Sequence, residues 1–243
     1  MRIPRKAILS PHSIFHKMWR THNKAYLLQP HEEKRSYLTC IKEELKQRCC
    51  AEDFVLHGYC IMSNHAHETG QVGDRLEPFS DHMRRAHGRF GLEFNQRNER
   101  QGAVAYDRAK TKIVQNQKAL RRCMFYSDCN PVRAGLIPHP TDIRWKGLSS
   151  CRFYAYGEKN DFSAMLSVPA WYLALGETPE LRQSRYRALL DQYLVEQGKK
   201  RDPRLGSGHF EGEEGWVEEK RVELSQWLKD HRRAPPSEAL PPG

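Results

Sequence analysis

The stretch from residue 54 to residue 71 constrains the fold of this chain more than any other. Its apolar side chains fall on both sides of an extended backbone, with one set at Phe54, Leu56, Cys60 and Met62 and the other at Val55, Tyr59 and Ile61. An extended segment with apolar residues on both sides is typical of a strand that is covered on both faces. We therefore expect one long central strand over residues 54–71.

Strand-like and helix-like patterns alternate on either side of this segment. The helices are indicated by apolar residues that recur at helical spacing, such as Tyr37, Leu38, Ile41 and Leu45. The expected elements are a strand within 14–28, a helix at 30–47, the strand at 54–71, a helix at 80–98, a short strand at 103–106, and a helix at 114–130 that ends before Pro131. This order predicts a compact α+β domain with helices packed on a sheet.

The C-terminal part of the chain has a different character. Residues 158–200 are predicted to form a helical extension, with helices near 165–175 and 178–194. From residue 201 onward glycine, proline and charged residues dominate, so 201–243 is predicted to be a charged, partly disordered tail. One amphipathic stretch at 215–231 interrupts it. The remaining residues, 1–157, are expected to form the main α+β domain.

Charge is distributed unevenly along the 243 residues. The formal net charge is +10; the first 200 residues carry +12 and residues 201–243 carry −2. A polyanionic partner fits the first part, although a basic but otherwise ordinary protein is the alternative. No apolar run is long enough to span a bilayer, and we expect a soluble, cytoplasmic protein that contacts no membrane. The seven cysteines form no C-x-x-C pair, which argues against a disulfide framework or a zinc ribbon.

Two histidines follow the apolar part of the predicted central strand. Residues i and i+2 of a strand point to one face, so His65 and His67 can direct their rings at one point. Neutral imidazoles are good ligands for a divalent metal. The triplet alone is weak, because a chain with 12 histidines produces such a spacing easily by chance. Two unconnected histidines are therefore the alternative.

A second pair of polar side chains lies on the last helix of the predicted domain. Tyr126 and Asn130 are four residues apart and share one helix face with Arg122. The amide oxygen of Asn130 suits Mg²⁺ or Mn²⁺. Each residue has an ordinary alternative: Tyr126 as a half-buried helix tyrosine and Asn130 as a polar helix end. Taken with the histidines, they suggest a metal site beside a tyrosine nucleophile.

Basic residues surround these motifs. The candidates for contact with nucleic-acid phosphates are Arg5, Lys6, Arg108, Lys110, Lys112, Lys118, Arg121, Arg122 and Arg133. Such residues provide affinity rather than sequence recognition. A solvated helix face is the alternative for any one of them. Trp19, Tyr59 and Phe90 could stack on bases, but core packing is the better interpretation for most of them.

The combined motifs resemble a known family. Met-x-Asn-His-x-His at 62–67, followed by Tyr-x-x-x-Asn-Pro-Val-Arg-Ala-Gly-Leu at 126–136, resembles the single-tyrosine HUH transposases. More narrowly, it resembles the REP-associated tyrosine transposases of the insertion-sequence-200-like group in bacteria. Residues 3–6, 56–62 and 145–154 also resemble segments of that family. The resemblance covers residues 1–157, with a weaker likeness to about residue 230.

The resemblance implies a fold, a chemistry and a substrate. The implied fold is a ferredoxin-like antiparallel sheet with the histidine pair on a central strand. His65, His67 and Asn130 would hold Mg²⁺ or Mn²⁺, and Tyr126 would be the nucleophile. The implied activity is that of a transposase and endonuclease, which cleaves and rejoins single-stranded or hairpin DNA through a 5′-phosphotyrosine, with palindromic repeats as partners. A nucleoid-associated monomer or homodimer is expected.

Three departures from the family pattern leave alternatives open. Glu68, Thr69 and Gly70 stand where the family usually continues apolar, residues 107–110 replace its usual basic segment, and Ser127 to Cys129 replace apolar residues. Asp128 could place negative charge near the DNA. One alternative is a catalytically inactive, domesticated DNA-binding protein of the same fold. Another is a metal-dependent phosphodiesterase in which Tyr126 is structural.

Overall fold

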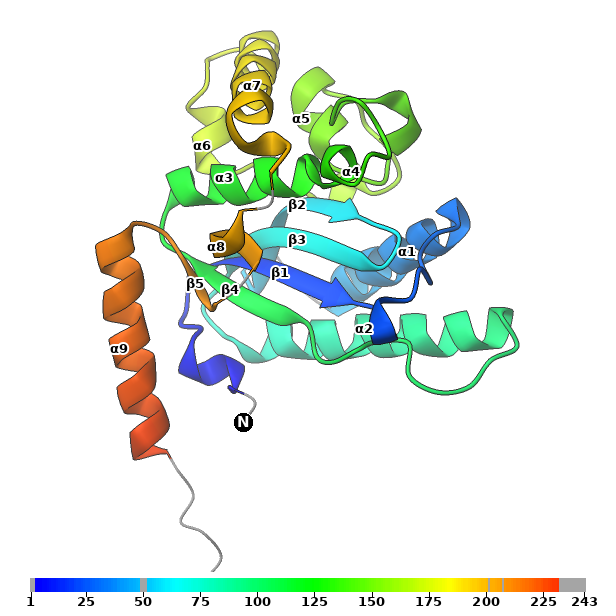
Figure 1. Cartoon of the computed structure of the whole chain (residues 1–243), viewed down its shortest axis with the longest axis vertical. Coiled ribbons are helices and arrows are strands. Elements are labelled where there is room, and N and C mark those ends of the chain that lie inside the picture. Colours follow the sequence, from blue (N-terminus) through cyan, green and yellow to red (C-terminus); the bar gives the residue numbers. More distant parts are fainter. Residues whose placement is uncertain (1–2, 49–51, 201, 207, 232–243) are drawn as a thin grey trace, which may run out of the picture.

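A five-stranded sheet forms the centre of the molecule, with helices packed on both of its faces (Figure 1). The computed structural model describes residues 3–48, 52–200, 202–206 and 208–231. The helices α1 and α2 cover one face, and α3 lies across the other. A further group of helices, α5 to α7, packs on α3 on the side away from the sheet.

The first four strands and two helices give a ferredoxin-like arrangement. In chain order they are β1 (Ile14–Arg20), α1 (His31–Arg48), β2 (Phe54–Ile61), β3 (His65–Val72), α2 (Glu77–Arg97) and β4 (Lys110–Val114). The strand order is β2-β3-β1-β4, all antiparallel, which is the split β-α-β-β-α-β arrangement. The predicted α+β class and ferredoxin-like sheet are therefore confirmed.

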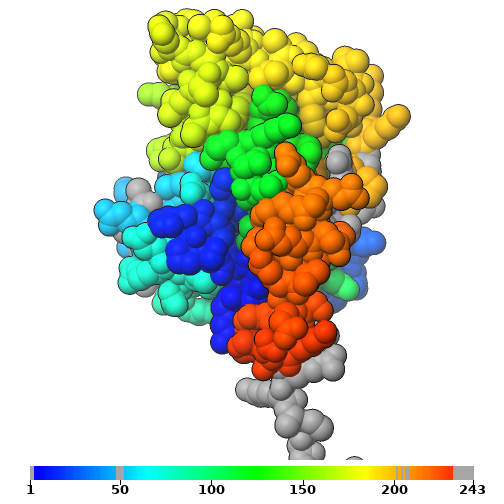
Figure 2. Space-filling view, turned by 90° about the vertical axis from the view of Figure 1, so that its left-hand side faces the viewer, coloured from blue at the N-terminus to red at the C-terminus, as the bar shows by residue number. Residues whose placement is uncertain are grey.

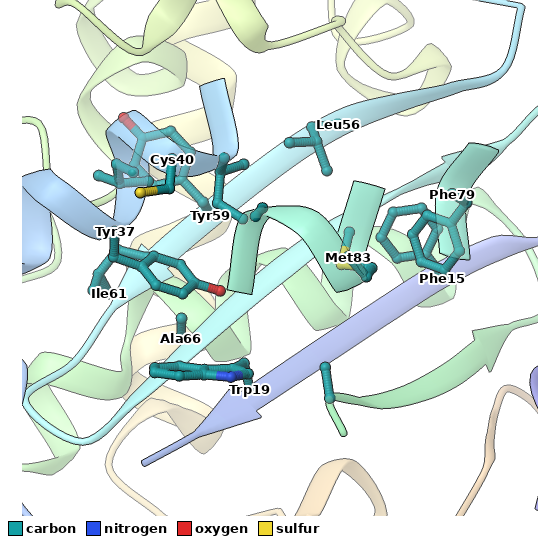
Figure 3. Close-up of a cluster of buried hydrophobic side chains, with 14 of the residues drawn as sticks. Phe15, Trp19, Tyr37, Cys40, Leu56, Tyr59, Ile61, Ala66, Phe79 and Met83 are labelled. Carbon is teal, nitrogen blue, oxygen red and sulfur yellow. The ribbon is translucent and has the colours of Figure 1, made fainter. Parts of the chain in front are cut away.

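Alternate side chains of β1 fill the core between the sheet and the helices α1 and α2. Phe15 and Trp19 point to the face covered by α1 and α2, and both are fully buried. Trp19 packs against Tyr37 of α1, with ring centroids 5.0 Å apart, and Phe15 packs against Phe79 of α2 at 4.6 Å (Figure 3). Such aromatic pairs bury large apolar areas, and they fix both helices on this face.

The opposite face is covered by α3 (Gln117–Asp128). The helix begins where the side chain of Asn116 accepts a hydrogen bond from the backbone N–H of Ala119, a regular N-cap. Its buried residues Leu120, Cys123 and Met124 belong to the second core of the protein. A short helix, α4 (Asn130–Arg133), follows after Cys129.

The helical extension packs on α3 through aromatic residues. Its elements are α6 (Ala170–Leu173) and α7 (Pro179–Tyr193), and they pack together with α5 (Cys151–Tyr156), which lies within the predicted 1–157 domain. Tyr186 of α7 is fully buried among the rings of Phe125, Tyr154 and Trp171. The shorter elements are the 3-10 helices η1 (Arg5–Ala7), η2 (His22–Lys24), η3 (Ile143–Trp145) and η4 (Ser163–Met165), and the π-helical turn η5 (Leu194–Gly198).

Asp128 is buried in this second core at 2% exposure, so it does not place charge at the surface as expected. Its carboxylate accepts hydrogen bonds from the hydroxyls of Ser149 at 2.8 Å and Tyr186 at 2.7 Å. Burial raises the pKa of Asp128 to about 7. Asp128 is the last residue of α3, and its buried hydrogen bond with Tyr186 connects this helix to α7.

The single strand predicted over residues 54–71 is also wrong, because the chain turns back at Met62–Asn64 and forms the β2–β3 hairpin. A β-bulge between Leu56 and Gly58 shifts the alternation of β2. Leu56 therefore shares the α1–α2 core with Tyr59 and Ile61, while Cys60 faces the other side. The prediction that Leu56 and Cys60 lie on the same side of the strand is therefore wrong.

Two smaller boundaries differ as well. The strand expected at 103–106 is β4 at Lys110–Val114, and only a single bridge joins Ala105 to Thr21. The helix expected over 114–130 ends at Asp128, and Pro131 lies near the start of α4. Proline is accepted there because the first turn of a helix needs no N–H from it.

The predicted tail is partly built into the fold. β5 (Phe210–Glu211) pairs in parallel with β4 and extends the sheet, so the sheet as a whole is mixed. After α8 (Pro203–Gly206) and β5, the helix α9 (Glu214–Asp230) packs beside the N-terminal segment (Figure 2). Residues 232–243 lie outside the described part. No helix in the described ranges is long and apolar enough to cross a membrane.

Candidate active site

The predicted metal ligands lie on the sheet face that α3 covers. His65 and His67 are in β3, and their rings are 5.0 Å apart. β3 is flanked by β2 and β1, so the expectation of a central strand holds. In the β1–β3 register, His67 is opposite Met18 and His65 is opposite Arg20. The two imidazoles therefore share their face with alternate residues of β1.

A third histidine, which the sequence interpretation missed, completes this cluster. His16 of β1 is the diagonal neighbour of His67, and its Nε2 lies 2.8 Å from Nδ1 of His67. The rings are stacked with centroids 5.0 Å apart, and each residue is only 3% exposed. Burial, with a smaller contribution from the charge of Lys112, lowers the pKa of His16 to about 3. His16 is therefore neutral at ordinary pH.

Asn64 fixes the tautomer of His65. The amide Nδ2 of Asn64 donates a hydrogen bond to the carbonyl of Lys24 at 3.0 Å, which turns its Oδ1 toward His65. That oxygen lies 2.7 Å from Nδ1 of His65. An amide oxygen only accepts, so Nδ1 of His65 carries the proton. The lone pair of Nε2 is therefore free for a metal.

The same reasoning applies to His67. A hydrogen bond between two neutral imidazoles needs one donor and one acceptor. If Nδ1 of His67 donates to Nε2 of His16, then Nε2 of His67 also presents a free lone pair. Burial lowers the pKa of His67 well below its ordinary value, which keeps the ring neutral. The two predicted ligands can thus offer the same kind of nitrogen to one ion.

α3 brings the predicted nucleophile to these histidines. The ring of Tyr126 lies edge-on to His67, with centroids 5.9 Å apart, and 6.4 Å from the ring of His16. Tyr126 is 6% exposed and belongs to the second core. The fold thus brings together a helix and a strand that are some sixty residues apart in sequence, as the predicted site requires.

Asn130 lies one helical turn beyond Tyr126, at the start of α4. Its Nδ2 is closed off from solvent and has no hydrogen-bond partner among the described residues. The oxygen of this amide is the atom that could serve as a ligand for a hard divalent cation. Within the described ranges no cluster of three or more His, Cys, Asp or Glu side chains could hold a metal ion. An amide oxygen would fit the donor set of a metal site built on the histidine pair.

Two arginines place positive charge at the site. The guanidinium of Arg133 lies 4.1 Å from the centre of the Tyr126 ring and donates a hydrogen bond to the Tyr126 carbonyl. Burial, with smaller contributions from the charges of Arg20 and Arg133, lowers the pKa of His65 to about 4. A neutral ligand set beside two cations suits an anionic group such as a DNA phosphate.

The other predicted phosphate contacts divide into two groups. Lys6, Arg108 and Lys110 are exposed, as a DNA contact requires. Lys112 is almost fully buried, and Arg122 forms an ion pair with the buried carboxylate of Glu211. Lys112 and Arg122 are therefore not free surface cations, and their contact with DNA stays a prediction. Arg5 is half-buried near Arg108.

The departure at Glu68 has a structural explanation. Glu68 follows His67 and so points to the opposite face of β3, where its Oε1 lies 2.5 Å from Nζ of Lys17. The hydroxyl of Tyr37 also donates to this oxygen at 2.9 Å. The Glu68 carboxylate thus forms a buried ion pair with Lys17 on the side of the sheet that α1 covers. It adds no charge to the face that carries His65 and His67.

His16, Asn64 and Arg20 are the residues that sequence reasoning did not assign to the site. Asn64 had a signal, because it directly precedes the histidine triplet in the motif at 62–67. His16 and Arg20 had none, since their place beside β3 depends on a strand register that spans about fifty residues.

Comparisons with known proteins give one remote similarity. No protein-family model and no curated protein matches the chain. A solved structure described as "Structure of the REP associates tyrosine transposase bound to a REP hairpin" is similar, at 18% sequence identity and a TM-score of 0.49. The match covers 70% of this chain and 100% of that chain. The fold and the site described above stand on this chain's own geometry.

Proposed function

We propose that this chain is a transposase that cleaves and rejoins single-stranded or hairpin DNA through a covalent link to Tyr126. The observation that carries the proposal is the position of the Tyr126 ring, 5.9 Å from the ring of His67. His65 and His67 can both present Nε2 toward an ion, and Asn130, one helical turn beyond Tyr126, would add an amide oxygen. This set is neutral, as a site that must accept a phosphate beside a divalent cation should be.

His65, His67 and Asn130 would hold Mg²⁺ or Mn²⁺. The bound ion would polarise the scissile phosphate and stabilise the charge on its nonbridging oxygens. Arg133 and Arg20 would bind the same or the adjacent phosphate, because both carry charge next to the histidine pair. Arg133 also holds Tyr126 in place, through its ring contact and its hydrogen bond to the carbonyl.

The covalent step balances without a further reactant. The phenol oxygen of Tyr126 attacks phosphorus and loses its proton to water, and the bond between phosphorus and the 3′ oxygen breaks. The 3′ oxygen takes up a proton and leaves as a hydroxyl, while the 5′ phosphate stays on tyrosine. Attack by the same or another 3′ hydroxyl reverses the exchange. Rejoining therefore needs no nucleotide cofactor.

A cleavage assay on a labelled DNA hairpin with an unpaired flank tests this proposal. In Mn²⁺ or Mg²⁺ the unmodified protein should give a protein–DNA adduct that survives denaturing electrophoresis. Tyr126→Phe should abolish the adduct and bind DNA as before. Tyr26→Phe is a matched control, since Tyr26 is 66% exposed and lies outside the site.

The rival functions predict different results in the same assay. A catalytically inactive DNA-binding protein would bind the hairpin and give no adduct with any variant. A plain phosphodiesterase would cut the DNA even with Tyr126→Phe. His65→Ala should remove metal-dependent cutting while it leaves most of the DNA affinity, and undiminished cutting by that variant would exclude His65 from the site.

A further inference from the structure

A cavity of about 830 Å³ lies on the face of β1 opposite to the histidines. It opens between α2, the side chain of Trp19, and residues 102–109 that lead into β4. Trp19 and His16 are three positions apart in the strand, so their side chains point to opposite faces. The cavity is therefore separate from the site at Tyr126, and its volume suits a ligand of nucleotide size.

The inner wall of the cavity is apolar and includes one hydrogen-bond donor that has no partner among the described residues. Trp19, Met83 and Val104 form this wall, and all three are buried. Figure 3 shows Trp19 of β1 and Met83 of α2 in the core that the cavity adjoins. Trp19 is 1% exposed, and its indole N–H has no hydrogen-bond acceptor. Buried indole N–H groups usually have an acceptor, and an acceptor atom of a ligand in the cavity would satisfy this one.

Two glycines of α2 border the cavity one helical turn apart. A Cβ atom on Gly88 would meet nothing within 4 Å, and one on Gly91 would meet only Val104 at 3.9 Å. Packing within the protein therefore does not require glycine at either position. Glycine in a helix interior is unfavourable relative to alanine. Close approach of a ligand to the helix backbone would explain both residues.

The rim of the cavity carries positive charge that is only partly compensated. Arg84 is paired with Asp81, and Asp107 contributes one carboxylate to the lining. Arg5 has no ion pair within the described residues, and its Nε is buried without a hydrogen-bond partner. Burial and the nearby charge of Arg108 lower the pKa of Arg5 to about 10. A half-buried cation next to another cation indicates a place for an anion.

We propose that this cavity binds one unpaired nucleotide, with its base against Trp19 and the glycine face of α2 and its phosphate on Arg5 and Arg108. A flat base with hydrogen-bond acceptors matches the apolar wall and the free indole N–H. The choice of DNA as the source of the nucleotide rests on the proposed function. An unpaired residue beside the hairpin is the expected occupant, and a free nucleotide shares the same chemistry.

The first test compares DNA hairpins with and without an unpaired flank. Binding is measured by fluorescence anisotropy in a Tyr126→Phe background, so that no cleavage interferes. Gly88→Leu fills the cavity and should weaken binding of the flanked hairpin about tenfold, the loss expected for one stacked base. Affinity for the blunt hairpin should not change. Gly215→Leu is the matched control, because it also places leucine at an open helix position, on α9.

Thermal unfolding separates lost binding from lost folding. Gly88→Ala should raise the melting temperature, because alanine favours the helix over glycine. Gly88→Leu should melt no lower than the unmodified protein. A variant that is at least as stable and yet binds the flanked hairpin less well has lost a contact to the ligand. Equal affinity of Gly88→Leu and the unmodified protein for the flanked hairpin would overturn the proposal.

A second experiment tests ligand binding in the cavity independently of DNA cleavage. The backbone amide signals of Gly88 and Gly91 are followed by NMR during titration with a deoxynucleoside monophosphate and then with a short single strand. Saturating shifts that disappear in Gly88→Leu support the cavity as a nucleotide site, and shifts with the monophosphate alone assign a free nucleotide as its ligand. No shift with either probe rejects the site, even if Tyr126 forms its adduct.

Discussion

At the scale of single residues, the histidine face depends on hydrogen bonds that fix which nitrogen each ring presents. Asn64 supplies the acceptor for His65, and His16 can supply it for His67. Partners of this kind orient metal ligands and set their tautomer. His16 can serve in this way because its low pKa keeps it neutral and able to accept.

Replacement of His16 tests this role. His16→Phe keeps a flat ring but removes the acceptor, so His67 should shift toward the tautomer protonated at Nε2. Imidazole ¹⁵N NMR of the metal-free protein measures that change directly. The affinity for Mn²⁺, measured by calorimetry, should fall about 10- to 100-fold. His16→Gln offers an amide oxygen near the same place and should restore part of the affinity. An unchanged His67 tautomer in His16→Phe would contradict the assignment.

Asp128 gives a prediction about pH. Its pKa is raised to about 7 by burial, against an ordinary value of 3.8, so the folded state holds the proton more tightly than the unfolded state. The stability that this group contributes is complete below about pH 4 and is lost as the pH rises through 7. The side chain in Asp128→Asn does not titrate, so this variant does not lose stability in this way as the pH rises. The free energy of unfolding of Asp128→Asn, relative to that of the unmodified protein, should rise between about pH 4 and 7, by up to about 1.4 kcal/mol per pH unit, and stay level above pH 7.

Urea unfolding at several pH values measures this difference. Asp191→Asn is a suitable control, since the carboxylate of Asp191 is exposed and contacts only His139 among the described residues. A constant difference between Asp128→Asn and the unmodified protein over this pH range would show that Asp128 does not titrate there.

At the scale of secondary structure, the buried pair of Lys17 and Glu68 ties β1 to β3 under α1. Both side chains are at most 1% exposed. Glu68→Gln removes the counterion of Lys17 and leaves a buried ammonium group, which should cost about 3–5 kcal/mol of stability. The double variant Lys17→Met/Glu68→Gln should lose much less than the sum of the two single variants. Urea denaturation of the four proteins measures the coupling, and additive losses would refute it.

Local patterns predicted the elements that have regular periodicity. The helices α1 and α2 were placed within three residues of their ends, because their apolar spacing continues without interruption. The turn between β2 and β3 was missed, since Met62, Ser63 and Asn64 include neither glycine nor proline. The bulge after Leu56 could not be read from alternation alone, since an inserted residue reverses the pattern.

The sequence predicted only those site residues that lie within a short local motif. His65, His67, Tyr126 and Asn130 each lie in a local pattern with a chemical meaning. The contact of His16 with His67 depends on strand pairing, and β5 is a two-residue strand that pairs with β4 about a hundred residues away. Interactions of this range are set by the tertiary structure, and no sequence window contains them.

At the scale of the whole molecule, the net charge of +10 predicts strongly salt-dependent DNA binding. Each phosphate contact contributes about 0.9 to the slope of log K against log salt for duplex DNA and about 0.7 for a single strand. Lys110 is exposed and has no ion pair among the described residues, so Lys110→Gln should reduce the slope by about that amount. The slope is measured from binding isotherms at several salt concentrations.

Arg122→Gln provides the contrast. Arg122 is already paired with Glu211, and its loss should leave the salt dependence unchanged while it lowers stability. An equal change of slope in both variants would mean that Arg122 exchanges Glu211 for a phosphate when DNA binds.

The alternation of β1 has a consequence for folding. Neighbouring residues of this strand serve opposite faces: His16 supports the histidine pair, Lys17 pairs with Glu68, and Trp19 forms the inner wall of the cavity. A slip by one position would exchange these faces and place an ammonium group where His67 needs an acceptor. A misaligned chain would thus lack the proposed metal site. Mn²⁺ uptake during refolding should therefore count only the molecules whose strands have aligned correctly.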